Sequence, residues 1–378
     1  MEDLKPRELE ILERYGFDLG TFTDLRRRYL AGELSREKNI ESRSVEPPQP
    51  DDLATMPERD TPRWRELEAR GGEALEGGKV ALAILNGGMA TRFGGRVKGV
   101  VPVKGEVSFL QLKIEDTRRM AERFGGTVPI LVMNSRTTHE ATREHLESNG
   151  RFGCPAENLF LFNQFLFPRL TAEGEIYRAD GETASFYGPG HGDFPIAMRA
   201  QGALEWLRER EVEHVLMANV DNLGARVDPV VIGFHLEQEV ECTAEMAPKW
   251  PGDQGGCPVR IGGKLQILEG FRFPEEFDQD QVEVFNSNTL TFRTDALDRD
   301  FPFTWFCVRK RVGKDEIIQF ERLVGQVTEF LDCAYLVVPR TGRRNRFYPV
   351  KTPRDLEEGD EVIKLLYPEI LESEGPGS

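Results

Sequence analysis

Residues 80–95 of the chain read VALAILNGGMATRFGG. The first six are apolar, which is typical of a strand buried on both faces of a parallel sheet. Gly87 and Gly88 follow closely, and a turn there exposes successive backbone amides that can cradle an anion. In open parallel sheets, ligands bind beyond the carboxyl ends of the strands. The stretch therefore predicts a strand that leads into a ligand-binding loop, although the glycines alone are equally compatible with an ordinary turn.

The same alternation of apolar runs and amphipathic stretches continues along the chain. We expect further strands at 128–134, 158–165, 214–221 and 334–338, and helices at 108–125, 138–148, 193–210, 315–330 and the C-terminus. This order predicts an α/β fold with a mostly parallel central sheet and helices on both faces. Residues 258–270, with a turn at Gly262-Gly263, and residues 282–292 favour antiparallel hairpin insertions in a layer beside that sheet.

The N-terminal part has a different texture. Residues 1–40 and 63–75 have helical patterns, and residues 41–62 between them hold five prolines in a polar setting. Such a stretch is typical of an extended connector. We therefore divide the chain into a helical N-terminal segment, residues 1–75, which contains the connector 41–62, and an α/β domain, residues 76–378.

Composition excludes several classes of function. The 378 residues include 65 acidic and 49 basic side chains, a net charge of −16, which argues against nucleic acid or an anionic membrane as the main partner. No apolar run reaches the roughly 18 residues of a membrane span. The N-terminus is polar, and the five cysteines match no metal or disulfide spacing. We expect a soluble cytoplasmic protein with reduced thiols, and a small anionic ligand remains possible.

Polar side chains follow several of the expected strands. The amide of Gln164 can donate to and accept from the edge of a nucleobase. His191 lies between Gly190 and Gly192, ahead of a helix whose N-terminus attracts anions. Asp221 ends a buried strand, where a carboxylate is a natural ligand for Mg²⁺. Taken singly, each residue also fits an ordinary structural role, as a surface amide, a structural histidine and a turn aspartate. The interpretation as a ligand site therefore depends on their common position at strand ends.

Three cations accompany these groups. Arg92 and Lys98 follow the glycine loop, and Lys351 stands two residues after Pro349, as a compact point charge suited to phosphate. Arg340, Arg343, Arg344 and Arg346 form a further basic run just upstream, which we interpret as a solvated face.

Seven motifs together resemble one family, and the resemblance covers roughly residues 79–356. They occur in the order found in UTP–glucose-1-phosphate uridylyltransferases (UDP-glucose pyrophosphorylases) of the UDP-sugar pyrophosphorylase family. The motifs are LNGGMATRFGG, MNSRTTHE, FNQFLFPRL, PGHGD, NVDNLGA, FNSNTL and VPR followed by PVKTPRDL. The resemblance implies a nucleotide-diphospho-sugar transferase fold, which is GT-A-like and Rossmann-type, and it makes residues 76–378 the catalytic domain.

The resemblance also implies a role for individual residues. Gly87, Gly88, Gln164 and Gly190 would bind the nucleotide, with Gln164 pairing with uracil. His191, Asn219 and the asparagines of FNSN, Asn286 and Asn288, would bind the sugar phosphate. Lys98, Lys351, Asp221 and Arg92 would form the catalytic group, with Asp221 holding Mg²⁺. Arg92 is a residue type that varies in the family.

The implied reaction makes UDP-glucose and pyrophosphate from UTP and glucose 1-phosphate, with Mg²⁺ as cofactor. Two alternatives stay open: a related enzyme for galactose or N-acetylhexosamine 1-phosphate, and an inactive protein that binds nucleotide sugars. The sequence departs from the family pattern at Met89-Ala90 and in an insertion of about four residues between Arg340 and Phe347, which could alter the lid over the phosphates. The family's C-terminal β-helix is not expected, and without it we expect a monomer.

Overall fold

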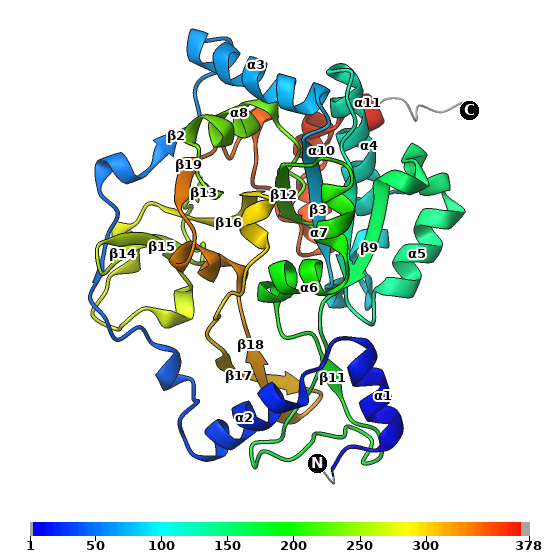
Figure 1. Ribbon diagram of the computed structural model, residues 1–378, viewed down its shortest axis with the longest axis vertical. Coiled ribbons are helices and arrows are strands. Elements are labelled where there is room, and N and C mark those ends of the chain that lie inside the picture. Colours follow the sequence, from blue (N-terminus) through cyan, green and yellow to red (C-terminus); the bar gives the residue numbers. More distant parts are fainter. Residues whose placement is uncertain (1–2, 372–378) are drawn as a thin grey trace.

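The computed structural model describes residues 3–371, and its centre is a sheet of eight strands (Figure 1). Their order is β2 (Ala54–Thr55), β19 (Cys333–Val337), β13 (Cys242–Pro248), β16 (Val284–Arg293), β12 (His214–Asn219), β3 (Val80–Asn86), β8 (Ile130–Asn134) and β9 (Leu159–Asn163). All neighbouring pairs are parallel except the two that β16 makes with β12 and β13. The expected mostly parallel sheet is confirmed.

Helices cover both faces of this sheet, as the sequence predicts. Alternate residues of β3 point to opposite sides: Ala81, Ala83 and Leu85 pack into one core cluster, and Val80, Leu82 and Ile84 into another. The first face is covered by α6 (Phe194–Ala200) and α7 (Ala203–Arg208). The second is covered by α4 (Phe109–Arg123), α5 (His139–Ser148), α8 (Pro229–Gln238), α10 (Asp360–Leu366) and α11 (Pro368–Leu371). Burial on both faces explains why β3 is apolar from Val80 to Leu85.

The N-terminal helices lie in two different places. Helices α1 (Pro6–Arg14) and α2 (Leu19–Leu30) pack with β10 (Phe167–Pro168), β11 (Phe186–Tyr187), β17 (Phe306–Val312) and β18 (Asp315–Glu321) at one end of the molecule (Figure 1). Helix α3 (Pro62–Glu76) packs against α8 at the other end. A Cβ at Gly71 would lie 1.8 Å from the carbonyl oxygen of Pro229, so these two helices approach more closely than side chains would allow. The division at residue 75 stays a prediction.

The connector 41–62 is extended, and it contributes to two sheets. Its strand β1 (Val45–Glu46) pairs with β14 (Cys257–Ile261), and β2 forms the edge of the central sheet. Strands β14 and β15 (Lys264–Leu268) form the hairpin expected at residues 258–270, with its turn at Gly262-Gly263. Three short pairs complete the strands, β10 with β11, β4 (Met89–Ala90) with β5 (Arg96–Val97), and β6 (Pro102–Lys104) with β7 (Val107–Ser108).

Three expectations about individual elements are wrong. Residues 315–330 form strand β18 and a 3₁₀ helix, Val324–Glu329, because a turn at Gly313 pairs β18 with β17 along its whole length. Residues 282–292 lie inside the central sheet as β16, since both faces of that strand are largely buried. The helix expected at 193–210 is broken into α6 and α7 at Gly202, whose φ of 79° is left-handed.

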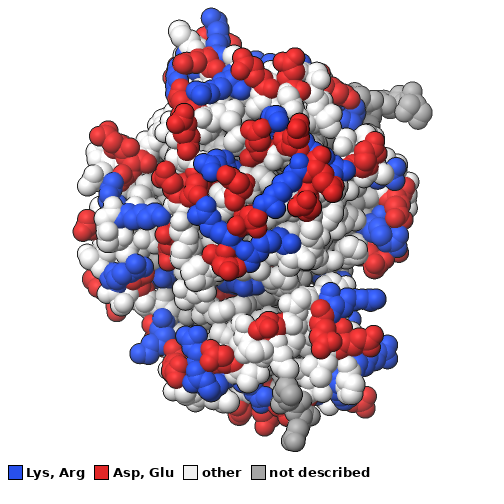
Figure 2. Space-filling model, viewed as in Figure 1, with Lys and Arg blue, Asp and Glu red and all other residues white. Residues whose placement is uncertain are grey.

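All five cysteines are free thiols. Within residues 3–371, no helix has both the length and the apolar character needed to cross a bilayer. Basic and acidic side chains are interspersed over the face in Figure 2, without a large area of a single sign.

Candidate active site

The carboxyl ends of β3, β8 and β12 meet at one edge of the central sheet, and the loops that follow them enclose a cavity of about 310 Å³. Eight of the residues singled out from the sequence line it: Gly87, Gly88, Lys98, Gln164, His191, Asn219, Asp221 and Lys351. Leu85, Met133 and Val220 supply its apolar wall. Residues that lie up to 264 positions apart in the sequence therefore share one site. The lining thus combines charged and polar groups with a few apolar side chains, as is usual for small-molecule sites.

Asp221 and Lys351 form an ion pair in this cavity. The Nζ of Lys351 lies 2.7 Å from Oδ2 of Asp221. The backbone holds the pair together, because the N–H of Val350 donates to the carbonyl oxygen of Asp221 at 2.9 Å. The carboxylate of Asp355 accepts from the N–H groups of Lys351 and Thr352, both at 2.7 Å, and so fixes Lys351 at the start of α9 (Pro353–Glu358).

Lys98 is a buried cation without a counter-ion. Its side chain lies over the rings of Phe93 and Phe109, with Nζ 4.0 Å and 4.7 Å from the ring centroids. Within residues 3–371, no group accepts a hydrogen bond from this Nζ or pairs with it at ion-pair distance. Burial lowers the pKa of Lys98 to about 8, against the opposing charge of Asp221. An anion that enters the cavity would relieve this cost.

The amide of Gln164 lies between two glycines. A Cβ at Gly87 would lie 2.6 Å from its Oε1, and a Cβ at Gly188 would lie 1.4 Å from its Nε2. Glycine is therefore required at both positions if the amide is to keep this place. Gly88 is different, because a Cβ there would meet no atom within 4 Å. In the described part of the chain, the Gln164 amide has no hydrogen-bond partner, so both its donor and its acceptor are available to a ligand.

His191 is held in one tautomer. The backbone N–H of Val324 donates to Nδ1 of His191 at 3.0 Å, which leaves the proton on Nε2. Burial lowers the pKa of His191 to about 4, so the ring is neutral near pH 7. Gly190 precedes it with a φ of 103°, where a Cβ would lie 2.4 Å from the carbonyl oxygen of Arg322. Gly190 shapes this loop and does not itself line the cavity.

Two predicted asparagines lie next to the cavity. The Nδ2 of Asn288 donates to Oδ1 of Asn219 at 3.2 Å, and the backbone N–H of Asn288 donates to Oδ1 of Asn286 at 2.9 Å. Glu269 lies beside them: a Cβ at Gly325 would be 3.1 Å from its Oε1 and 3.6 Å from Nδ2 of Asn286. Burial raises the pKa of Glu269 to about 7. Glu269 could not be predicted from its sequence context, because it follows an ordinary hairpin strand.

Arg92 lies on an exposed part of the glycine loop and does not line the cavity, so its catalytic role stays a prediction. The upstream run of arginines is not the solvated face that we expected. Arg346 is buried and pairs with Glu245, and its Nη2 lies 2.7 Å from Oε1 of that carboxylate. Arg340 pairs with Asp253 and stacks on Trp250, with 3.9 Å between the guanidinium and the ring centroid.

The other two arginines of this run also have specific places. Arg344 stacks on Trp64 of α3, 4.4 Å from the ring centroid. Only Arg343, in the insertion, is exposed, and it lines a different cavity beside the C-terminal helices. The insertion therefore does not line the 310 Å³ cavity, and its effect on the cover over the phosphates stays a prediction.

The candidate metal site is one carboxylate. Within the described residues, no group of three or more His, Cys, Asp or Glu side chains could enclose a metal ion. Asp221 is the single carboxylate that lines the cavity, and its Oδ1 makes no hydrogen bond with the described residues. Mg²⁺ is commonly held by one or two carboxylates together with water and substrate phosphates. The donor set at Asp221 therefore fits a metal that arrives with a polyphosphate.

Three features together define a nucleotide-binding α/β protein: a mostly parallel sheet, a glycine loop after strand β3, and a cavity with two lysines and one aspartate. A similar fold occurs in the UDP-N-acetylglucosamine pyrophosphorylase of Trypanosoma brucei, with a TM-score of 0.76, 25% identity, and coverage of 91% of this chain and 76% of that one. The family model for UTP–glucose-1-phosphate uridylyltransferase matches residues 19–361, and this chain belongs to that family of nucleotidyltransferases.

Individual relatives agree with this assignment. UTP–glucose-1-phosphate uridylyltransferase 2 of Dictyostelium discoideum is 32% identical over 340 residues, which are 85% of this chain and 65% of that protein. The UTP–glucose-1-phosphate uridylyltransferase of Musa acuminata is 31% identical over 352 residues, which are 89% of this chain and 72% of that protein. The chain thus spans about two thirds of the length of these relatives.

Proposed function

We propose that this protein transfers a uridylyl group between UTP and glucose 1-phosphate, giving UDP-glucose and pyrophosphate. The observation that carries the proposal is the convergence of Lys98, Lys351 and Asp221 with the unpaired amide of Gln164 in one cavity at the strand ends. This reaction brings two polyanions together. The cavity offers two cations for them: Lys98 has no counter-ion, and Lys351 can exchange Asp221 for a phosphate oxygen. The names of the curated relatives support the same reaction.

The chemistry is an in-line displacement at phosphorus. A phosphate oxygen of glucose 1-phosphate attacks the α-phosphorus of UTP, the new P–O bond forms, and the bond to the pyrophosphate oxygen breaks. No protein nucleophile is required, so the chain contributes position and charge. Lys98 and Lys351 would neutralise phosphate oxygens as charge moves onto the leaving pyrophosphate. The backbone at Gly87 and Gly88 would hold the nucleotide phosphates.

Specificity would come from the uncharged groups. The amide of Gln164 can donate to a uracil carbonyl oxygen and accept from its N3–H, a pattern that cytosine does not offer. His191 can donate from Nε2 to a phosphate oxygen of the sugar phosphate, because the N–H of Val324 occupies Nδ1 and leaves the proton on Nε2. Asn219, Asn288, Asn286 and Glu269 lie together and would bind the sugar hydroxyls.

We further propose Mg²⁺ as the cofactor, held by Asp221 and by the phosphates of UTP. A bound Mg²⁺ would neutralise charge on the polyphosphate and fix its geometry. Lys351 already contacts Oδ2 of Asp221, and the free Oδ1 is the atom we assign to the metal. We also propose that the protein acts as a monomer in the cytoplasm, where its five free thiols would stay reduced.

The test is pyrophosphorolysis in the presence of Mg²⁺, with release of UTP as the readout. UDP-glucose, UDP-galactose and UDP-N-acetylglucosamine are compared at equal concentrations. We expect UDP-glucose to give the highest kcat/KM. Because the fold also resembles a UDP-N-acetylglucosamine pyrophosphorylase, preference for that substrate is the second candidate. Turnover of none of the three, with intact binding of UDP-glucose, would instead identify an inactive nucleotide-sugar-binding protein.

A further inference from the structure

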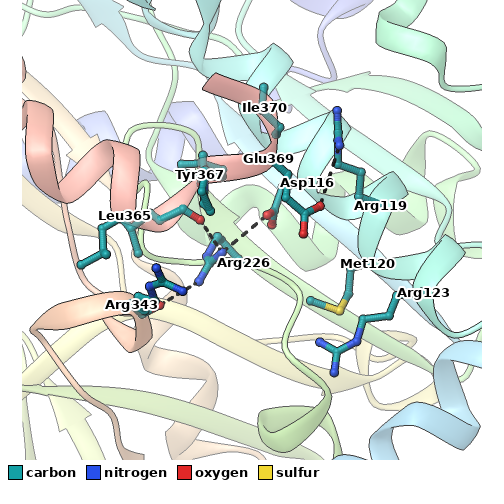
Figure 3. Close-up of a pocket in the computed structure, with 12 residues that line it drawn as sticks. Asp116, Arg119, Met120, Arg123, Arg226, Arg343, Leu365, Tyr367, Glu369 and Ile370 are labelled. Atoms are coloured by element: carbon teal, nitrogen blue, oxygen red, sulfur yellow. Dashed lines mark hydrogen bonds and ion pairs between the residues drawn. The ribbon is translucent and has the colours of Figure 1, made fainter. Parts of the chain in front are cut away.

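A second cavity, of about 330 Å³, opens between the C-terminal half of α4, the helices α10 and α11, and the 3₁₀ helix Gly342–Arg344 (Figure 3). It shares no lining residue with the cavity at the strand ends. Four arginines line it, Arg119, Arg123, Arg226 and Arg343, against two acidic residues, Asp116 and Glu369. This is a local excess of positive charge in a protein whose net charge is −16.

Two of these arginines touch each other. The Nη2 of Arg226 donates to the carbonyl oxygen of Arg343 at 3.2 Å, and its Nη1 donates to that of Leu366 at 2.7 Å. Asp116 approaches Arg226 at 3.5 Å and so offsets one of the charges. The guanidinium of Arg343 has neither a hydrogen bond nor an ion pair with the described residues. The contact joins the Arg226 guanidinium to a backbone carbonyl oxygen, so the positive charge of Arg343 stays available to a bound anion.

The remaining arginines are incompletely paired. Arg119 reaches Glu369 only at 3.8 Å and Glu115 only at 4.0 Å, which are long distances for a charge-assisted hydrogen bond. Arg123 is the exception, because it pairs with Glu68 at 3.0 Å. Among the described residues, the Nε atoms of Arg119 and Arg226 have no hydrogen-bond partner, but both atoms are buried away from solvent. The donors available to the cavity are therefore the guanidinium of Arg343 and the weakly paired guanidinium of Arg119.

The rest of the lining is apolar. Met120, Leu365 and Pro368 are half-buried along the same cavity. A cavity of this volume is at the lower end of the range that takes small organic ligands. Guanidinium forks bind phosphate oxygens in pairs, and the apolar wall would contact a non-polar body. We propose that this cavity binds a small organic phosphate at a site separate from the one at the strand ends.

The two sites share a segment of chain. Arg226 stands five residues after Asp221, and the hydroxyl of Tyr367, in the wall of the second cavity, donates to the carbonyl oxygen of Leu223 at 2.6 Å. Residues 222–226 directly follow Asp221 in the sequence. The same residues also contact groups that line the second cavity. A ligand that fixes Arg226 and Arg343 should slow amide hydrogen exchange in this segment.

The experiment is isothermal titration calorimetry with adenosine monophosphate, whose base does not match the uracil-reading amide. The wild type is compared with Arg343→Ala, with Arg36→Ala as a matched exposed arginine outside the cavity, and with Lys351→Ala. We expect Arg343→Ala to weaken binding about tenfold or more, because it removes a charged donor, and the other two variants to bind like the wild type.

The proposal is overturned if the wild type does not bind adenosine monophosphate, if Arg343→Ala binds it unchanged, or if Lys351→Ala is the variant that loses it. Inorganic phosphate serves as a second probe. Binding of phosphate as tight as that of adenosine monophosphate would contradict the role of the apolar wall. None of these readouts depends on turnover, so they are independent of the proposed uridylyl transfer.

Discussion

The ammonium group of Lys351 lies 2.7 Å from the carboxylate of Asp221, although 130 positions separate the two residues in the sequence. An isolated bridge between Asn222 and Pro349 joins the same two segments through the backbone. In the free protein each charge neutralises the other. When a polyphosphate enters, Lys351 can move to a phosphate oxygen and leave the carboxylate to a metal. The pair therefore keeps both groups of the proposed reacting centre ready and close.

Replacing Asp221 by Asn should raise the Mg²⁺ concentration needed for activity. The amide keeps the shape of the side chain and removes the charge that attracts the metal. At a fixed, subsaturating Mg²⁺ concentration we expect a loss of about 100-fold in kcat, partly recovered at higher concentrations. Rates measured as a function of Mg²⁺ for both proteins give the comparison. The same half-saturating Mg²⁺ concentration in both would remove Asp221 from the metal site.

Lys98 should set an upper pH limit on the use of UTP. Its pKa near 8 means that the free protein carries this charge below pH 8 and loses it above. Because kcat/KM reports the free enzyme, we expect kcat/KM for UTP to fall by about tenfold per pH unit above pH 8. Lys98→Arg stays charged and should move this limb to higher pH, even if its maximum rate is lower. An unchanged limb in Lys98→Arg would assign the ionisation to another group.

Gly188→Ala should act through Gln164. A Cβ at position 188 would overlap the Gln164 amide, so the side chain must leave its place between Gly87 and Gly188. We expect KM for UTP to rise about tenfold in Gly188→Ala, and by a similar amount in Gln164→Ala. The double variant should be no worse than Gln164→Ala alone, because the clashing group is already gone. Additive losses in the double variant would show that Gly188 acts independently of the amide.

Glu245 and Arg346 should stabilise the fold beneath the site. Both are almost fully buried, and Arg346 also donates to the carbonyl oxygen of Arg226 at 2.9 Å. Glu245→Ala removes the hydrogen-bonded carboxylate of the buried Arg346 and leaves it only the longer pair with Asp228 at 3.4 Å, which should lower the free energy of unfolding by about 3 kcal/mol. Glu358→Ala, which removes the exposed partner of Arg354, is the control and should leave the melting temperature unchanged. Equal melting temperatures for the two variants would contradict this account.

Most of the candidate site could be predicted, because the hydrophobic pattern of the sequence indicates where the strands end. The runs before Gly87, Asn134 and Asp221 are mostly apolar, so their carboxyl ends and the residues that follow were predictable. Residues that matter because another part of the chain approaches them closely could not be predicted in this way. Gly188 matters only because the Gln164 amide lies against it, and Glu269 only because it folds back beside Asn286.

The errors in the fold have a related cause. Residues 315–330 have apolar residues at helix-compatible spacing, but their pairing with β17 through the turn at Gly313 decides the outcome. The arginines between 340 and 346 are charged and adjacent, and only tertiary contacts with Asp253, Trp64 and Glu245 distinguish them from a solvated run. Local pattern does not encode such partners.

The central claim is that Lys351 belongs to the reacting centre of a uridylyltransferase. The most direct test is kcat for the reaction of UTP with glucose 1-phosphate, measured for the wild type and for Lys351→Ala after circular dichroism has confirmed that both are folded. The account predicts a loss of about 100- to 1,000-fold, because one cation that faces the transferred phosphates is removed. A Lys351→Ala variant within threefold of the wild type, or a wild type that forms no UDP-glucose, would contradict it.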